Sequence, residues 1–420
     1  MSIYPTRVPA SEFVKIFTSP TDEEICLGSH GARIDVTNFG EWGRLPAMED
    51  KLGSVFAENF ATRGEIGASV SVWRDGQEIV SLHSGTVSKD PDAAPWTADT
   101  LIPIWSATKG LAAACCLRAL HTEGYDLEMA VAELWPEFAG GGKRAVTIGQ
   151  ALSHSAGLSG LDEKISITDY RAVIEGLERQ TPSWLPGTAH GYHPRTFGFL
   201  AEEMLRRVTG AENLNQYFRQ EIAEPLDLDL WIGLPEPEHH RVATLYPGRF
   251  TPSDSERRFY DAFNATGNET RRAFTSPVGL NSIADMNTPA GWTAGIASMG
   301  GVGNVQSLGK FYSCLATGGG DLFDPKVIGW MAERRTTATE DRTLLAATAF
   351  SAGFMVESPD SIEPLFGPTE GSFGHPGAGG SHAFADPENR LAFAYAMNQM
   401  EVGALPNRRS LDLVDALYSV

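Results

Sequence analysis

The chain has 420 residues, of which 42% are hydrophobic and 20% are charged, a balance typical of a globular protein with a large core. Acidic residues outnumber basic ones by 53 to 33, giving a formal net charge of −20, and such a surface is a poor match for nucleic acid or an anionic membrane. The N-terminus shows no apolar signal segment, and no run approaches the roughly 18 apolar residues that a membrane span needs. We therefore expect a cytoplasmic protein that binds neither nucleic acid nor membrane.

The first quarter of the chain predicts an extension, a helix and a hairpin. Residues 1–45 show weak periodicity and are expected to pack as an extension over the surface of the fold. Apolar residues recur at helical spacing over 47–62, which predicts a helix. Residues 67–82 alternate on both sides of Asp75-Gly76, the pattern of two antiparallel strands joined by a tight turn. The apolar residues 101–105 then lead into an Ala- and Leu-rich segment that favours a helix.

The middle of the chain differs from its two ends. Residues 126–289 favour helices and loops, with the clearest helix at 196–208, ended by Thr209-Gly210. Strand patterns return at 349–356, 379–387 and 391–400, and a helix is expected at 407–418. These patterns predict an α+β fold in which residues 46–125 and 290–420 share one antiparallel sheet flanked by helices. Residues 126–289 would form an inserted, mostly helical domain.

The start of the helix after residue 105 carries a candidate nucleophile. Ser106 and Lys109 are three residues apart, so on a helix they share one face, and Ser-x-x-Lys is a motif of penicillin-recognising serine enzymes. Ser106 could equally be a helix N-cap, which is a structural role. A second match, Ser307 and Lys310, lies in an amphipathic helical stretch without a preceding apolar strand. We interpret the second match as chance.

Two further motifs fall at transitions between segments. The first is Gly191-Tyr192-His193-Pro194, directly before the 196–208 helix, and the second is the glycine-rich run from Gly374 to Ser381. By themselves, Tyr192 could be an amphipathic core residue and the glycines could form an ordinary turn. Glycines in a strand also let its backbone come close to a ligand.

Together, these motifs resemble the serine β-lactamase-like superfamily, closest to class C β-lactamases and family VIII carboxylesterases. The resemblance covers roughly residues 45–420 and rests on five short motifs in family order. They are Ser106-Ala-Thr-Lys109, Ala151-Leu-Ser-His-Ser-Ala-Gly-Leu158, Pro186-Gly187-Thr188, Tyr192 and His375-Pro376-Gly377. The resemblance implies an α/β domain built from both ends of the chain, an all-helical domain, and a site in the cleft between them.

The resemblance also implies roles for individual residues. Ser106 would be the acylated nucleophile, and Lys109 and Tyr192 would share its proton; which of the two is the base stays open. The backbone N–H groups of Ser106 and Ala378 would form the oxyanion hole. Substrate contacts are expected from the side chains or backbone of His375, Gly377, His193 and Trp105.

Two departures from the β-lactamase pattern bear on the substrate. Pro194 stands where those enzymes carry an asparagine amide, and His375-Pro376-Gly377 replaces Lys-Thr-Gly, with its permanent cation and hydroxyl. Both losses favour short, neutral esters, cleaved by a serine carboxylesterase with at most weak β-lactamase activity. A β-lactamase, a D-amino-acid peptidase or amidase, or an acyltransferase of the same fold is the alternative.

Other readings have less support. A non-catalytic scaffold of this fold would not need serine, lysine and tyrosine together, and an α/β-hydrolase would need a Gly-x-Ser-x-Gly elbow, which the chain lacks. The histidines at 190, 193, 239 and 240 have no carboxylate-spaced partners, so we expect no metal and no cofactor. The four cysteines have no disulfide-like spacing and are expected to be buried as small hydrophobes. The expected partner is a small-molecule ester, and the sequence does not indicate an oligomeric state.

Overall fold

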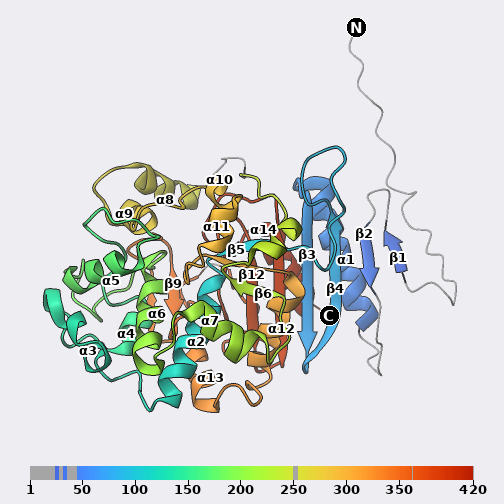
Figure 1. Ribbon diagram of the computed structural model, residues 1–420. Helices are drawn as coiled ribbons and strands as arrows, with labels where there is room; N and C mark the ends of the chain where they lie inside the picture. Colours follow the sequence, from blue (N-terminus) through green and yellow to red (C-terminus); the bar gives the residue numbers. More distant parts are fainter. Residues whose placement is uncertain (1–23, 28–31, 36–44, 249–253, 362, 420) are drawn as a thin grey trace, which may run out of the picture.

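The computed structural model describes residues 24–27, 32–35, 45–248, 254–361 and 363–419. Most of the expected N-terminal extension therefore lies outside the described residues. Figure 1 labels the elements in chain order. The strands are β1 (Glu24–Leu27), β2 (Ala32–Asp35), β3 (Gly67–Arg74), β4 (Gln77–Gly85), β5 (Ile102–Trp105), β6 (Leu230–Ile232), β7 (Gly301–Gly303), β8 (Thr336–Ala338), β9 (Thr348–Phe350), β10 (Met355–Val356), β11 (Phe373–Gly374), β12 (His382–Asp386) and β13 (Leu391–Met397).

The helices include those predicted at 47–62, 196–208 and 407–418. They are α1 (Leu45–Thr62), α2 (Thr108–Thr122), α3 (Val131–Leu134), α4 (Ile148–Leu152), α5 (Tyr170–Arg179), α6 (Thr196–Thr209), α7 (Leu214–Phe218), α8 (Asp254–Asn264), α9 (Glu269–Thr275), α10 (Ile283–Met286), α11 (Pro289–Thr293), α12 (Val305–Ala316), α13 (Pro325–Ala332) and α14 (Arg408–Tyr418). Three short helical segments of other types are η1 (Pro136–Gly142), η2 (Arg219–Ala223) and η3 (Glu236–Arg241).

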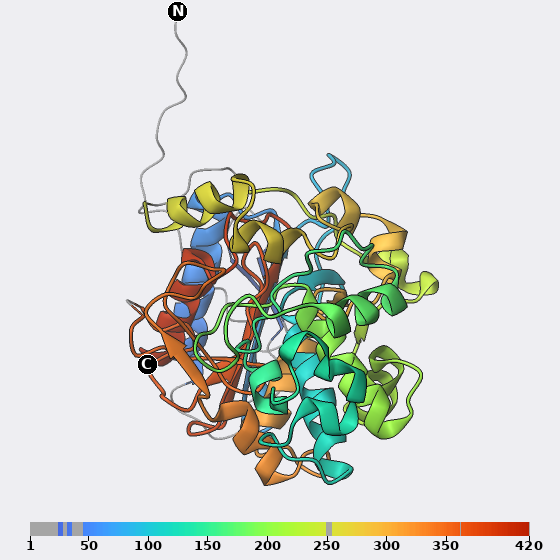
Figure 2. The same cartoon turned by 90° about the vertical axis from the view of Figure 1, so that its left-hand side faces the viewer.

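The main sheet is antiparallel and joins the two ends of the chain. Its strand order is β1-β2-β4-β3-β13-β12-β11-β10-β9-β8. Strand β3 of the predicted hairpin therefore pairs with β13 near the end of the chain, as the α+β prediction requires. Figures 1 and 2 both show the blue and red ends of the chain side by side, with the cyan and green helices next to them. A small second sheet has the order β5-β7-β6. Strand β6 lies within residues 126–289, the region expected to be mostly helical, and pairs with β7 from outside it. The domain boundaries at 125/126 and 289/290 stay a prediction.

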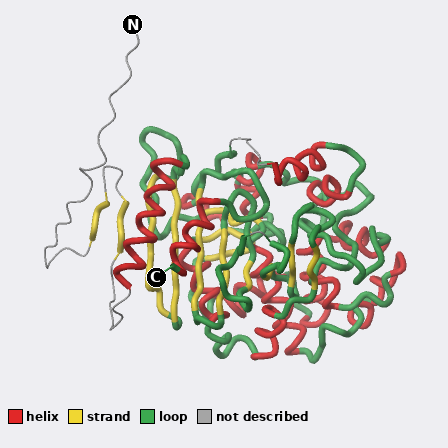
Figure 3. Tube along the Cα trace, turned by 180° about the vertical axis from the view of Figure 1, so that it is seen from behind, coloured by secondary structure: helices red, strands yellow, loops and turns green. Residues whose placement is uncertain are grey.

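The centre of the sheet is covered on both faces. In β13, Ala392, Ala394 and Ala396 pair with Trp73, Ser71 and Ser69 of β3, and a Cβ at Gly309 of α12 would touch Ser71 and Trp73. The alanines of β13, the serines of β3 and Gly309 therefore let α12 approach one face of the sheet closely. Side chains alternate along a strand, so Val70 and Val72 face the opposite side, where α1 and α14 lie together (Figure 3). Burial on both faces explains why every residue of β13 is buried.

Local sequence signals account for several element ends. The predicted hairpin turn has positive φ at both Asp75 (52°) and Gly76 (82°), the conformation of the turn that suits the twist of a two-residue hairpin. Gly210 ends α6 with φ 70°, as a C-terminal glycine does. One strand prediction was wrong: the segment 349–356 is two short strands, β9 and β10, that pair with each other. The reversal includes Gly353 at φ 93°.

Candidate active site

Ser106 lies in a strand-to-helix turn and not at a helix cap. Strand β5 ends at Trp105, whose φ of 50° is unusual for a bulky residue, and α2 begins at Thr108 with Ala107 at the N-cap position and no side-chain cap. The Ser106 carbonyl accepts the Lys109 N–H at 2.9 Å, and the Ser106 side chain lies 3.3 Å, Oγ to Nζ, from Lys109. The turn thus presents the hydroxyl to the lysine.

Lys109 is fully buried and bonded to backbone carbonyls. Its Nζ lies 2.8 Å from the carbonyl oxygens of Pro194 and Ser298, and no carboxylate in the described chain forms an ion pair with it. Burial, together with the positive charge of Arg195, holds the pKa of Lys109 well below its ordinary value. The Arg195 guanidinium is itself occupied by the carbonyls of Pro277 at 2.8 Å and of Gly279.

Tyr192 packs beside these two residues. The Lys109 Nζ lies 4.8 Å from the centroid of the Tyr192 ring. The phenol is buried, and no described group makes a hydrogen bond of standard geometry with its hydroxyl. Burial raises the pKa of Tyr192 above its ordinary value; the proximity of Ser106 opposes this shift and the carboxylate of Asp341 adds to it. The sequence motifs from three distant segments therefore meet at one point.

The His375 side chain forms another wall of the site. Its ring centroid lies 5.7 Å from that of Tyr192, and Nδ1 lies 2.8 Å from the Pro376 carbonyl. Because a carbonyl only accepts, Nδ1 carries the proton and Nε2 is an unprotonated acceptor with no partner among the described groups. Burial, aided by nearby Lys109, lowers the pKa of His375 to about 3, so its ring is neutral near pH 7.

The turn after His375 is held against β5. A Cβ at Gly377 would clash with the Ile104 carbonyl, which also accepts a hydrogen bond from the Ser381 hydroxyl at 3.0 Å. Only glycine permits this approach. The N–H of Gly377 donates to Ser381 O at 2.7 Å and that of Gly379 to Gly403 O at 3.1 Å.

Two backbone N–H groups at this junction are unused. Within the described part of the chain, the N–H groups of Ser106 and Ala378 donate to no protein acceptor, whereas their neighbours Ala107, Gly377 and Gly379 do. Buried or half-buried N–H groups are normally paired. These are the two groups that the resemblance assigns to an oxyanion hole.

The predicted substrate contacts of His193 and Trp105 differ in their settings. His193 is fully buried; its Nδ1 donates to Gly191 O at 2.6 Å and its Nε2 accepts the Leu158 N–H at 3.0 Å. Both nitrogens are used by the backbone, so the structure places His193 in a supporting position with no polar atom free for a ligand. Trp105 is half-buried beside Ser106, and its indole N–H has no partner among the described groups.

The second Ser-x-x-Lys match has no such surroundings. The Ser307 hydroxyl accepts the Asp229 N–H at 2.8 Å, and Lys310 reaches the Asp227 carbonyl at 3.5 Å. Neither side chain is bonded to the other, so this pair serves to hold α12 beside the segment before β6.

Sequence reasoning missed several members of the site. The carbonyls of Pro194 and Ser298 hold Lys109, Arg195 adds positive charge, and the buried carboxylate of Asp341 accepts the Tyr192 N–H at 3.1 and 3.0 Å. A carbonyl is common to all residue types and leaves no signal in the sequence. Asp341 lies 149 residues from Tyr192, and no spacing rule links them.

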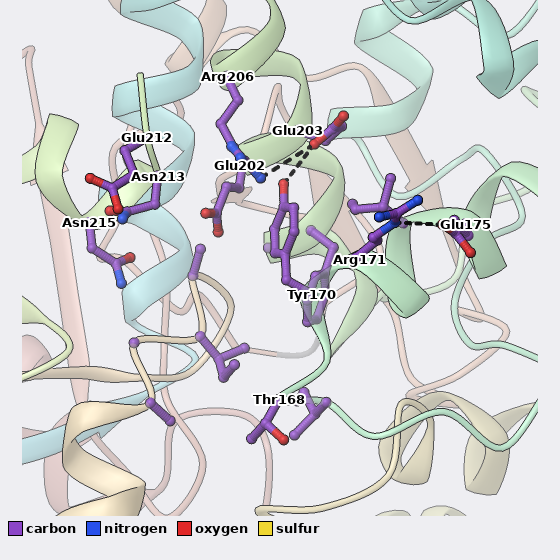
Figure 4. A pocket seen from close by; sticks show the side chains of 18 of the residues that line it. Thr168, Tyr170, Arg171, Glu175, Glu202, Glu203, Arg206, Glu212, Asn213 and Asn215 are labelled. Atoms are coloured by element: carbon purple, nitrogen blue, oxygen red, sulfur yellow. Dashed lines mark hydrogen bonds and ion pairs between the residues drawn. The ribbon is translucent and has the colours of Figure 1, made fainter. Parts of the chain in front are cut away.

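A cavity of about 940 Å³ lies elsewhere, between α5, α6, α7 and residues 294–297 (Figure 4). Its lining does not include Ser106, Lys109, Tyr192 or His375. Its central carboxylate, Glu203, accepts from the Tyr170 hydroxyl at 2.8 Å and from Arg207 at 2.7 Å. This cavity is therefore separate from the candidate site around Ser106, where polar atoms of Trp105, Tyr192 and His375 make no hydrogen bond of standard geometry with the described groups.

The described chain shows neither a metal site nor a membrane-spanning helix. No group of three or more histidine, cysteine, aspartate or glutamate side chains there could hold a metal ion. No helix among the described residues has the length and apolar character that a membrane span requires. Cys115 and Cys116 are buried in α2, and burial raises both thiol pKa values.

Comparison with known proteins assigns the family. The beta-lactamase family model matches residues 53–416. The chain belongs to the beta-lactamase family. It is 32% identical over 356 residues to "Esterase/beta-lactamase LipL" of Mycobacterium tuberculosis (strain ATCC 25618 / H37Rv), covering 82% of this chain and 80% of that protein.

Solved structures agree with the fold. A family VIII carboxylesterase has 35% identity and a TM-score of 0.78, covering 88% of this chain and 97% of the other. A penicillin-binding protein homologue from Caulobacter crescentus has 34% identity and a TM-score of 0.78, covering 91% and 99%. The resemblance to the β-lactamase-like superfamily and its α+β fold is thus confirmed, and the chain is a hydrolase of this family with a carboxylesterase among its structural neighbours.

Proposed function

We propose that this member of the beta-lactamase family is a serine carboxylesterase that cleaves short, uncharged esters through an acyl-enzyme on Ser106. The observation that carries the proposal is the placement of the Ser106 hydroxyl 3.3 Å from a buried lysine amine with no ion-pair partner in the described chain. An activated serine needs a neighbouring base to take its proton. The similarity to an esterase/beta-lactamase and to a family VIII carboxylesterase supports an ester as the substrate.

Lys109 is the better candidate for the base. A neutral lysine amine has two N–H groups and one lone pair; the carbonyls of Pro194 and Ser298 accept the two N–H groups at 2.8 Å. The lone pair is then left for the Ser106 hydroxyl. The lowered pKa of Lys109 favours this neutral form, and the raised pKa of Tyr192 keeps the phenol protonated.

The reaction follows from these assignments. The Ser106 Oγ attacks the ester carbonyl while its proton passes to the Lys109 Nζ, and the carbonyl oxygen, now negative, accepts from the N–H groups of Ser106 and Ala378. The Tyr192 hydroxyl gives its proton to the departing alcohol and takes one from Lys109, so the C–O bond of the ester breaks, the acyl group stays on Ser106 and Lys109 is neutral again. Water then attacks the acyl-enzyme, with the same groups taking and returning a proton.

The surroundings of the site favour an uncharged substrate. His375 is neutral and Pro194 has no amide side chain, so neither can provide the contacts that a β-lactam carboxylate and acylamino group need. The half-buried rings of Phe274 and Phe259 continue outward from Tyr192, with ring centroids 6.3 Å apart for Tyr192 and Phe274 and 5.2 Å for Phe274 and Phe259. An apolar acyl or alcohol group would find contact there.

The substrate class gives a direct test. We expect kcat/KM for p-nitrophenyl acetate or butyrate to exceed that for a chromogenic cephalosporin by roughly 10²–10³. Losing a neutral hydrogen bond and a charge-assisted one costs the antibiotic about 0.5–1.5 and 1.5–3 kcal/mol. Initial rates over both substrates provide the measurement, and a cephalosporin cleaved as well as or better than the esters would make the chain a β-lactamase.

The pH dependence tests the base. Only unprotonated Lys109 can accept the serine proton, so kcat/KM should rise with pH through the Lys109 pKa and then level off. The midpoint of this rise, called the alkaline limb, should lie well below pH 10.5, because burial and the charge of Arg195 lower the Lys109 pKa. His193 and His375, with pKa values of about 3, remain neutral across it.

A matched pair of variants locates the cause of this limb. Arg195→Gln removes the positive charge and should move the limb to higher pH, whereas Arg195→Lys keeps the charge and should leave it in place. Both variants lose guanidinium contacts to the carbonyls, so loss of those contacts alone would affect them alike. A limb near pH 10 in the parent enzyme would show that Lys109 is not the neutral base.

A further inference from the structure

The carboxylate of Asp341 is buried beneath the active site without a lysine or arginine partner in the described chain. Asp341 lies between β8 and β9. Its only ion-pair neighbour among the described residues is the His190 Nε2, 3.6 Å away. Burying an unpaired carboxylate is unfavourable unless hydrogen bonds replace its water. The hydrogen bonds that it accepts therefore indicate what it holds in place.

Three backbone N–H groups donate to Asp341. The Tyr192 N–H lies 3.1 and 3.0 Å from Oδ1 and Oδ2, and those of Thr343 and Leu344 donate to Oδ1 at 2.7 and 2.8 Å. The Thr348 hydroxyl donates to Oδ2 at 3.1 Å. Two of the N–H groups belong to the turn that follows Asp341, and the third belongs to the proposed catalytic tyrosine.

The turn after Asp341 also forms hydrogen bonds with the Tyr192 carbonyl and with His190. The Thr343 hydroxyl lies 2.9 Å from both the Tyr192 carbonyl oxygen and the Asp341 Oδ1, so its one proton is shared between these two acceptors. The Arg342 N–H donates to His190 O at 3.2 Å. Because the Thr348 hydroxyl gives its proton to Asp341, it accepts one from the His190 Nε2 at 2.8 Å. Residues 190–192 are thus bonded at several points to residues 341–348.

The Tyr192 side chain has no comparable anchor. Its hydroxyl interacts with the Ser106 side chain without a hydrogen bond of standard geometry. Its ring contacts the rings of Phe350 and His154 and lies under the Lys109 amine. The backbone of Tyr192 is held more firmly: its N–H donates to the Asp341 carboxylate, and its carbonyl oxygen lies 2.9 Å from the Thr343 hydroxyl of the same turn. The position of the phenol relative to Ser106 and Lys109 therefore depends on this backbone.

We propose that Asp341 is the positioning residue for Tyr192: its carboxylate fixes the backbone from which the phenol reaches Ser106. This inference rests on the proposed function, because it assigns Tyr192 a proton-transfer role. Proton transfer requires hydrogen-bond reach, and a displacement of about 1 Å at a catalytic group can reduce the rate by about 10²-fold.

Asp341→Asn is the test, and Asp386→Asn is its matched control. Asp386 is also fully buried, and accepts from the Thr369 hydroxyl at 2.8 Å, the Tyr418 hydroxyl at 2.6 Å and the Asn389 N–H at 3.1 Å, at the far end of β12. Both carboxylate oxygens of Asp341 accept hydrogen bonds. The NH₂ group of an asparagine at position 341 would therefore face another donor and would lose at least one of these bonds. We expect kcat for p-nitrophenyl butyrate to fall about 10²-fold in Asp341→Asn with KM little changed, measured well below the melting temperature. Asp386→Asn should lower the melting temperature but keep the kcat of the folded enzyme.

A milder pair covers the case in which Asp341→Asn does not fold. Thr343→Val removes the hydroxyl that lies 2.9 Å from both the Tyr192 carbonyl oxygen and Asp341 Oδ1, and Thr343→Ser keeps it. We expect kcat to fall severalfold in the valine variant and to recover in the serine variant. Equal kcat values in the two variants, or an unchanged kcat in folded Asp341→Asn, would overturn the proposal.

The parent enzyme separates this proposal from the function on which it rests. If the parent neither hydrolyses the ester nor reacts with a fluorophosphonate probe at Ser106, the proposed function fails. If the parent does both and the Asp341 and Thr343 variants match it, only the positioning role fails.

Discussion

Replacement of Ser106 by alanine is expected to abolish ester hydrolysis while leaving the protein folded. The variant loses the oxygen that attacks the carbonyl, and removing a serine nucleophile typically lowers kcat by roughly 10⁴–10⁶. The loss to stability should be small, because Ser106 is half-buried and its hydroxyl has one long hydrogen bond of standard geometry among the described groups, to Lys109 at 3.3 Å. Initial rates with p-nitrophenyl butyrate and a thermal melt measure the two effects.

The chain provides its own control in the second Ser-x-x-Lys match. Ser307→Ala removes a hydroxyl that accepts the Asp229 N–H, so it should cost about 0.5–1.5 kcal/mol of stability and leave kcat nearly unchanged. A fluorophosphonate probe should label the parent and the Ser307 variant but not the Ser106 variant. Equal losses of activity in the two variants, or loss only in Ser307→Ala, would contradict the assignment of the nucleophile.

Lys109→Ala and Tyr192→Phe are each expected to lower kcat by about 10²–10⁴, the range for a general acid or base. The double variant should be little worse than the more damaged single one, because residues that pass one proton act as a unit. Single and double variants compared at one pH, with kcat and KM determined separately, provide the measurement. Losses that multiply in the double variant would show that the two side chains do not share a task.

The two substitutions should differ in their effect on stability. Tyr192→Phe removes a buried hydroxyl that has no standard hydrogen bond among the described groups, so the melting temperature should hardly change. Lys109→Ala leaves the carbonyls of Pro194 and Ser298 without their donor, and each unsatisfied group can cost about 1–3 kcal/mol. A Tyr192→Phe variant that is folded but nearly inactive is thus the cleaner evidence for chemistry at this position.

The arrangement explains how the pKa of a lysine amine is lowered in the interior of this chain. Lys109 has no carboxylate to stabilise its charge in the described chain, and nearby Arg195 disfavours a second cation. The two carbonyls that accept its N–H groups orient the lone pair without needing a proton on it. In the proposed function, this burial is what lets Lys109 serve as the base for the serine.

Much of the fold was predictable because its signals are local. Helical periodicity identified α1 and α6, and the Asp75-Gly76 turn identified the β3-β4 hairpin. The pattern failed at 349–356, where a reversal at residues 351–354 divides an apparently continuous strand into β9 and β10. Both short strands are buried and apolar, so composition alone could not reveal the break.

The sequence by itself determined the pair at the start of the site. Ser106 and Lys109 are three residues apart at the entrance to a helix, so local geometry alone brings them to one face. The order of the motifs then sufficed to identify the family. Neither conclusion required any knowledge of which distant segments meet.

Only the tertiary structure decided how that pair is made reactive and supported. The carbonyl of Ser298 lies 189 residues from Lys109 along the chain, the Ser381 hydroxyl bonds to Ile104 across 277 residues, and Asp341 meets Tyr192 across 149. His193, expected to contact substrate, proved to have both ring nitrogens bonded to the backbone. Backbone groups have no residue-specific signal, and burial, which sets the pKa of Lys109, is a property of the packed chain and not of any segment.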